Sequence, residues 1–126
     1  MCFSWVSGTW ILNGDECTDT VTEAIKIGYR HIDGAEAYGN DKEIGIAIQR
    51  AIGEGIVDRK DLFIANKISD PNNAGYQGTK KLVKRQLQVM GLEYFDLYMI
   101  HSPMQVNTLF LHRMLTLVLT YMVLHT

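Results

Sequence analysis

The feature that most constrains the fold is an alternation of helix-like and strand-like segments at nearly constant spacing. Ile32, Ile64 and Leu97, which centre the apolar segments, are 32 and then 33 residues apart. A (β/α)8 barrel assigns roughly 31 residues to each unit, so 126 residues hold about four units. The alternation predicts a parallel α/β sheet, and it fits an open doubly wound sheet as well as part of a barrel. The predicted helices cover residues 20–27, a segment from 41 to about 53 or 55, and residues 79–90; the predicted strands cover residues 31–33, 62–67 and 94–100.

Capping signals set the predicted helix starts. Thr20 with Glu23 and Asn40 with Glu43 have the spacing of a capping box, in which each side chain bonds to the other's backbone N–H. Residues 13–15, Asn-Gly-Asp, are a turn signal typical of hairpins. The polar segment 69–78 is predicted to be a loop long enough to carry functional residues.

Composition excludes several classes of protein. The 12 Lys and Arg against 14 Asp and Glu give a net charge of −2, which excludes a strongly basic nucleic-acid binder. The 47% apolar and 21% charged content is typical of one globular domain. Two cysteines, Cys2 and Cys17, predict neither a disulfide framework nor a metal site.

The predicted localisation is cytoplasmic. No basic residue precedes Lys26, so the charged start of a secretory signal is missing from this sequence. The longest apolar stretch, residues 114–124, is shorter than the about 20 residues needed to span a bilayer, so no membrane contact is expected.

Four polar residues occupy or follow the ends of the predicted strands: Asp33, Tyr38, Lys67 and His101. In a parallel α/β fold these ends share one face, where such folds bind ligands. A phenol is a weak acid at neutral pH, and an adjacent ammonium stabilises the phenolate that remains after proton transfer. The set therefore suits proton donation to a carbonyl oxygen, with Tyr38 as acid, Lys67 held by Asp33, and His101 orienting the carbonyl.

Each of the four also has a structural interpretation. Lys67 fits a solvated strand end, and Tyr38 fits a half-buried loop aromatic. Asp33 before a glycine fits a turn, and His101 fits a strand boundary. The sequence contains no Gly-x-Gly-x-x-Gly after a strand and no Walker loop, so a dinucleotide would not be bound in the Rossmann manner.

Several segments closely resemble the aldo-keto reductases. They are Gly8-Thr9-Trp10, residues 28–35 (Gly-Tyr-Arg-His-Ile-Asp-Gly-Ala), Tyr38-Gly39-Asn40, Glu43-Ile44-Gly45, residues 61–67 (Asp-Leu-Phe-Ile-Ala-Asn-Lys) and residues 91–103 (Gly-Leu-Glu-Tyr-Phe-Asp-Leu-Tyr-Met-Ile-His-Ser-Pro). The resemblance covers residues 8–103. It implies a (β/α)8 barrel that uses NADPH to reduce small aldehydes and ketones to alcohols.

The resemblance assigns roles to individual residues. Asp33, Tyr38, Lys67 and His101 match the family's catalytic tetrad, with Tyr38 as general acid. Thr9 and Asp33 are expected beside the nicotinamide, and the substrate is expected to contact Trp10, Tyr38 and His101.

Three departures from the family pattern lie inside the matched region. Asp41 replaces Glu, which keeps a negative charge at a helix start. Val6-Ser7 alters the first strand. Ile68-Ser69 replaces the usual Leu-Trp, which removes an aromatic wall of the substrate pocket.

After residue 103 the sequence no longer follows the family pattern, and this change defines the predicted domain organisation. Residues 1–103 are expected to form the N-terminal half of a reductase barrel, about four β/α units, and residues 104–126 an unmatched apolar tail. Such a truncated chain is expected to be inactive alone. The alternative is a non-catalytic half-barrel that associates with itself or with a full-length relative through open strand edges.

Overall fold

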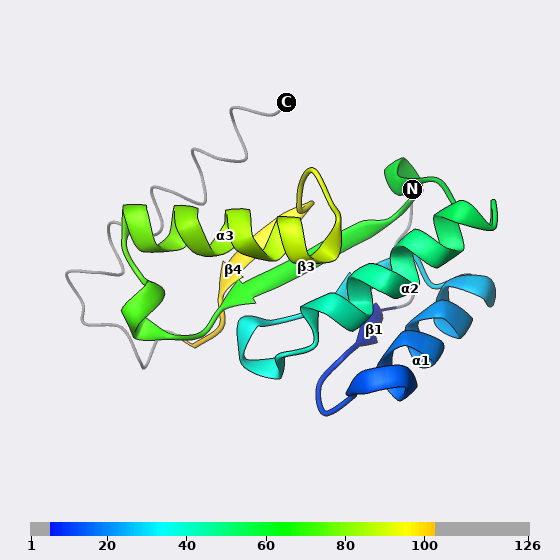
Figure 1. Cartoon of the computed structure of the whole chain (residues 1–126), viewed down its shortest axis with the longest axis horizontal. Helices are drawn as coiled ribbons and strands as arrows, with labels where there is room; N and C mark the ends of the chain where they lie inside the picture. The colour runs from blue at the N-terminus through cyan, green and yellow to red at the C-terminus, as the bar shows by residue number, and fades with distance from the viewer. Residues whose placement is uncertain (1–5, 103–126) are drawn as a thin grey trace.

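Four parallel strands form a single sheet in this computed structural model, which describes residues 6–102. The predicted tail at residues 104–126 lies outside the described residues, as does the boundary at residue 103. The strands are β1 (Val6–Gly8), β2 (His31–Asp33), β3 (Phe63–Ile68) and β4 (Leu97–Ile100). The helices that connect them are α1 (Gly14–Lys26), α2 (Asp41–Gly53) and α3 (Tyr76–Met90) (Figure 1).

The order of the strands distinguishes a barrel from a doubly wound sheet. Each strand pairs with the next one in the sequence, in the order β1-β2-β3-β4, and all three pairings are parallel. Right-handed crossovers that advance in one direction place every connecting helix on the same face of the sheet, as Figure 1 shows. A doubly wound sheet reverses its direction at a switch point and carries helices on both faces. The prediction of the first four units of a barrel is therefore confirmed.

The core fills the space between this sheet and its helices. Ile32 of β2 and Ile64 of β3 are paired in register and are at most 1% exposed. They pack in one cluster with buried residues of α1 and α2, among them Ile25, Ile44 and Ile48. Because side chains alternate along a strand, the neighbours of these isoleucines point to the opposite face. Asp33 and Lys67 therefore face away from the helices.

The predicted start of the first helix is wrong. The helix begins at Gly14, six residues before Thr20, and Asn13 occupies the N-cap position. The Asn-Gly-Asp segment is thus a helix start rather than a hairpin turn, and the acidic Asp15 and Glu16 lie in the first turn, where they favour the helix dipole. Thr20 and Glu23, which have the spacing of a capping box, lie inside this helix and not at its start. The nearby Thr22 hydroxyl donates to the Thr18 carbonyl one turn back, at 2.7 Å.

The other boundaries differ less from those predicted. Asn40 does occupy the N-cap position of α2, but its side chain makes no capping bond. Helix α3 begins three residues early, at Tyr76, after Gly75 with a φ of 91°. Strand β3 ends one residue later than predicted, and β4 begins three residues later.

Two further observations on the described residues concern membrane spanning and the Cys17 thiol. Between residues 6 and 102 no helix is long and apolar enough to cross a membrane. Burial raises the pKa of the Cys17 thiol to about 11, and the charge of Glu43 adds to the shift. This thiol is therefore protonated at neutral pH and is a core side chain, not a nucleophile.

Candidate active site

The site is centred on an ion pair between neighbouring strands. Asp33 ends β2, and Lys67 lies near the end of β3 on the same face of the sheet. The Lys67 Nζ atom lies 2.6 Å from Asp33 Oδ1 and also donates to the Gly34 carbonyl at 2.9 Å. The two side chains are 13% and 29% exposed, so the pair is partly shielded from water. The Asp33 carboxylate thus fixes the position of the ammonium.

Tyr38 and His101 lie beside this pair. Tyr38 ends a short 3-10 helix, η1 (Glu36–Tyr38), and the Lys67 ammonium is 5.8 Å from the centre of its ring. The His101 backbone N–H donates to the Ile68 carbonyl at 2.9 Å, which continues the pairing of β3 with β4. The rings of Tyr38 and His101 meet edge to face, with centres 5.5 Å apart. The structure therefore brings the four predicted site residues together at the carboxyl ends of three neighbouring strands.

Thr9 and Trp10, predicted to contact cofactor and substrate, differ in their surroundings. Thr9 is fully buried, and its N–H and its hydroxyl both donate to the Asp33 carbonyl, at 3.2 and 3.1 Å. This double contact joins the end of β1 to the end of β2. The Trp10 side chain is 70% exposed.

The turn after Trp10 holds a strained residue. Ile11 has a φ of 63° and is the one non-glycine residue with positive φ in the described part of the chain. A β-branched side chain in this left-handed region crowds the backbone. The buried Asn40 side chain maintains the turn, because its Nδ2 group donates to the Thr9 carbonyl at 2.7 Å and the Leu12 carbonyl at 2.9 Å.

Replacing Ile11 with Asn is expected to stabilise the fold by about 1 kcal/mol, since asparagine tolerates this backbone conformation. The matched control is Ile27→Asn, because Ile27 is equally exposed, at 75% against 74%, but has an ordinary φ of −82°. Urea unfolding of both variants measures the difference. If the urea midpoint falls as much in Ile11→Asn as in Ile27→Asn, the backbone at Ile11 is not strained.

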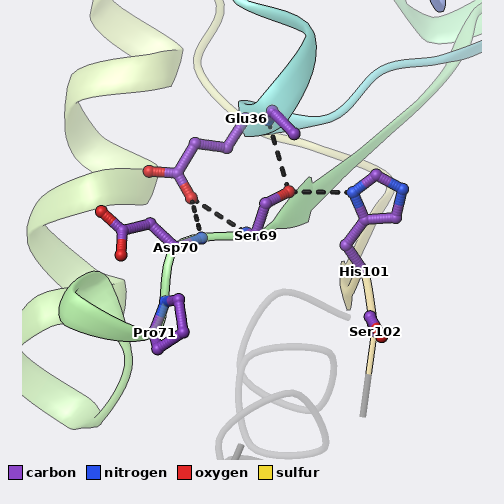
Figure 2. A pocket seen from close by; sticks show the side chains of 7 residues that line it. Glu36, Ser69, Asp70, Pro71, His101 and Ser102 are labelled. Atoms are coloured by element: carbon purple, nitrogen blue, oxygen red, sulfur yellow. Dashed lines mark hydrogen bonds between the residues drawn. The ribbon is translucent and has the colours of Figure 1, made fainter. Parts of the chain in front are cut away.

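Glu36 is a central residue of the site that sequence reasoning missed. One carboxylate oxygen accepts hydrogen bonds from the backbone N–H groups of Ser69 and Asp70, both at 2.9 Å, and the other accepts from the Asn73 side chain (Figure 2). The carboxylate therefore holds the loop after β3 against η1, which carries Tyr38. No local pattern signals this role, because the partners are more than 30 residues away in the sequence.

A cavity of about 620 Å³ opens at the same place. His101 is the one predicted site residue in its lining, and Ser69 replaces the aromatic residue expected there by family resemblance (Figure 2). The cavity is lined by Glu36, Ala37, Ser69, Asp70, Pro71, His101 and Ser102.

A buried polar network supports the sheet on the opposite side. Asp41, at the start of α2, accepts hydrogen bonds from Asn66 Nδ2 at 2.9 Å and from Gln86 Nε2 at 3.0 Å. Tyr98 completes the chain by donating to Gln86 Oε1 at 2.7 Å. Burial raises the pKa of the Tyr98 phenol well above its usual range, so Tyr98 remains a neutral donor. Asp41 thus does more than place a charge at a helix start, since it links β3 to α2 and α3.

The strand order and the group of four residues Asp33, Tyr38, Lys67 and His101 define a class of protein. This class is the (β/α)8 barrel with polar residues at the carboxyl ends of its strands. The chain belongs to the aldo/keto reductase family, whose family model matches residues 4–122. A solved aldose reductase from Schistosoma japonicum superimposes with a TM-score of 0.72 at 36% identity, covering 78% of this chain and 32% of that one.

Curated relatives share nearly half of the matched residues. A probable NAD(P)H-dependent D-xylose reductase of Emericella nidulans is 46% identical over 100 residues, which is 79% of this chain and 31% of the relative. The NADPH-dependent aldose reductase of Saccharomyces cerevisiae is 47% identical over 97 residues, covering 76% and 29%. A 4-dihydromethyl-trisporate dehydrogenase of Mucor mucedo is 48% identical over 96 residues, covering 76% and 30%. The chain therefore spans about a third of the length of these relatives.

Proposed function

We propose that residues 6–102 form the proton-donating part of an NADPH-dependent reductase that converts aldehydes and ketones to alcohols. The observation that carries the proposal is the Asp33–Lys67 ion pair placed beside the Tyr38 ring, with the His101 ring in edge-to-face contact with Tyr38. A cluster of this kind at the carboxyl ends of parallel strands has the position and the groups that carbonyl reduction requires.

Each residue has a defined role in this proposal. The Tyr38 hydroxyl donates its proton to the carbonyl oxygen as that oxygen gains negative charge. The Lys67 ammonium stabilises the phenolate left behind, and Asp33 holds the ammonium in place through the 2.6 Å contact. His101 orients the carbonyl, and the phenolate regains a proton from solvent after the alcohol leaves.

The described residues fit the nicotinamide end of NADPH. Asp33 places a carboxylate beside the ammonium of Lys67, and these two groups suit the amide and the ribose hydroxyls. The buried Thr9 hydroxyl donates to the Asp33 backbone carbonyl, so Thr9 supports this end of the site by holding the end of β2. When bound, NADPH supplies a hydride to the carbonyl carbon. Relatives of this chain are named as NAD(P)H-dependent, which supports the choice of cofactor.

The substrate class is proposed to be small aldehydes, including aldose sugars, because relatives are named as xylose and aldose reductases. The test is a chimera in which residues 6–102 replace the matching segment of the Saccharomyces cerevisiae aldose reductase. We expect the purified chimera to oxidise NADPH when D-xylose is added, and the 126-residue chain alone to show no turnover. A chimera that folds and binds NADPH but reduces no aldehyde would reject the proposal.

Association between copies is the second candidate. Within the described sheet, β1 and β4 each pair with one neighbouring strand, and unpaired strand edges favour association. His31, Phe63, Leu97 and Met99, which lie on strands of this sheet, are only half-buried. Light scattering on the 126-residue chain discriminates between the candidates, because a well-folded monomer is inconsistent with association.

A further inference from the structure

Ser69 connects the two parts of the site that carry Tyr38 and His101. It follows β3 directly, and its backbone is fixed by the hydrogen bond to the Glu36 carboxylate. Its hydroxyl oxygen accepts a hydrogen bond from the Ala37 N–H at 3.3 Å, in the 3-10 helix that ends at Tyr38. The same oxygen lies 2.9 Å from His101 Nδ1 (Figure 2). One hydroxyl group thus contacts both neighbouring elements.

The chemistry of a hydroxyl links the direction of this hydrogen bond to the tautomer of the histidine. A serine hydroxyl has one hydrogen to donate and two lone pairs that accept. The Ala37 N–H occupies one lone pair, which leaves the hydroxyl its hydrogen and one further lone pair for the contact with His101 Nδ1. A neutral imidazole whose Nδ1 accepts a hydrogen bond carries its own proton on Nε2.

We propose that Ser69 is a positioning residue that donates to His101 Nδ1 and holds the neutral ring in the Nε2–H form. The Nε2 atom is turned away from Ser69 (Figure 2), so its N–H is the donor offered to a carbonyl oxygen. The role of this N–H as a donor to a carbonyl oxygen rests on the proposed function, whereas the Nε2–H form of the ring does not. The edge-to-face contact with Tyr38 then keeps the ring plane fixed relative to the acid.

The residue that family resemblance predicts at this position is tryptophan, whose indole N–H donates but does not accept. That side chain could not accept from the Ala37 N–H as Ser69 does. The replacement therefore changes more than the width of the pocket, because it supplies His101 with a partner from the loop that Glu36 holds.

The experiment measures the tautomer of His101 directly. Long-range proton–nitrogen correlation spectra of the ¹⁵N-labelled 126-residue chain, at a pH where the ring is neutral, separate the two nitrogens, and His101→Gln assigns the signal. We expect His101 to be almost entirely in the Nε2–H form. In Ser69→Ala the tautomer ratio should move toward that of a solvent-exposed histidine side chain by roughly fivefold, the bias that one neutral hydrogen bond provides.

Two variants separate positioning from a general change in the loop. Ser69→Thr keeps the hydroxyl and is expected to retain the wild-type ratio. Ser102→Ala makes the same chemical change in another residue that lines the cavity, and it should leave the ratio unchanged. Amide spectra verify that each variant is folded.

Two results would overturn the inference. One is a wild-type His101 that carries its proton mainly on Nδ1, a result that needs no folded variant. The other is a tautomer ratio that is the same in wild type and Ser69→Ala. Neither spectrum requires NADPH or turnover, so an inactive chimera would reject the proposed function and leave the role of Ser69 standing.

Discussion

Replacing Tyr38 with Phe in the chimera is expected to lower kcat/KM for aldehydes by a factor of about 10²–10⁴, the usual contribution of a positioned general acid. The substitution removes one oxygen and keeps the ring, so the edge-to-face contact with His101 and the approach of Lys67 remain available. The loss should appear in kcat, because proton transfer occurs in the chemical step. NADPH fluorescence titration should give an unchanged Kd, since Tyr38 is not among the residues assigned to the cofactor.

The matched control for this prediction is Tyr94→Phe. Tyr94 lies outside the cluster, and its ring packs against the Arg59 guanidinium, 3.9 Å from the ring centre. Removing its hydroxyl is expected to leave kcat/KM unchanged. A Tyr38→Phe chimera that turns over as fast as the Tyr94→Phe chimera would exclude Tyr38 as the acid.

The site residues that sequence reasoning identified share one property: each lies at or near a strand end. The spacing of Asp33, Lys67 and His101 reflects the length of the β/α unit, so parallel strands bring them together without any knowledge of side-chain contacts. For the same reason the alternation of elements predicted β2, β3 and β4, whereas the number of about four units came from the chain length. The alternation could not distinguish a barrel from an open sheet, because that difference lies in the strand order and not in the local pattern.

The contacts that sequence reasoning missed join residues that are far apart in the sequence. Glu36 and Ser69 contact each other across 33 residues, and Asp41 contacts Gln86 across 45. Each is an ordinary polar residue in its local sequence, and its function is defined only by the partner that the fold supplies. The misplaced start of α1 has a different cause, since Asn-Gly-Asp suits both a hairpin turn and a helix start. Packing against α2 decides between these alternatives.

Gly45 shows how a motif residue can have a purely steric role. It belongs to the Glu-Ile-Gly segment that resembles the family, and it lies in α2 where that helix crosses the end of α3. A Cβ atom at position 45 would lie 2.5 Å from Met90 Cα, 2.6 Å from its carbonyl oxygen and 2.8 Å from its carbonyl carbon. These are backbone atoms, which cannot rotate out of the way as a side chain does. The two helices approach this closely only because residue 45 has no side chain.

Gly45→Ala is therefore expected to destabilise the fold by about 3 kcal/mol, because the overpacked helices must separate. This loss exceeds the gain of up to about 1 kcal/mol that alanine brings to a helix interior. The control is Gly53→Ala at the other end of the same helix, where an added Cβ meets nothing within 4 Å and a small stabilisation is expected. Urea unfolding of the 126-residue chain should thus shift the midpoints in opposite directions. Equal shifts in the same direction would show that helix propensity, and not the contact with Met90, determines the requirement for glycine at position 45.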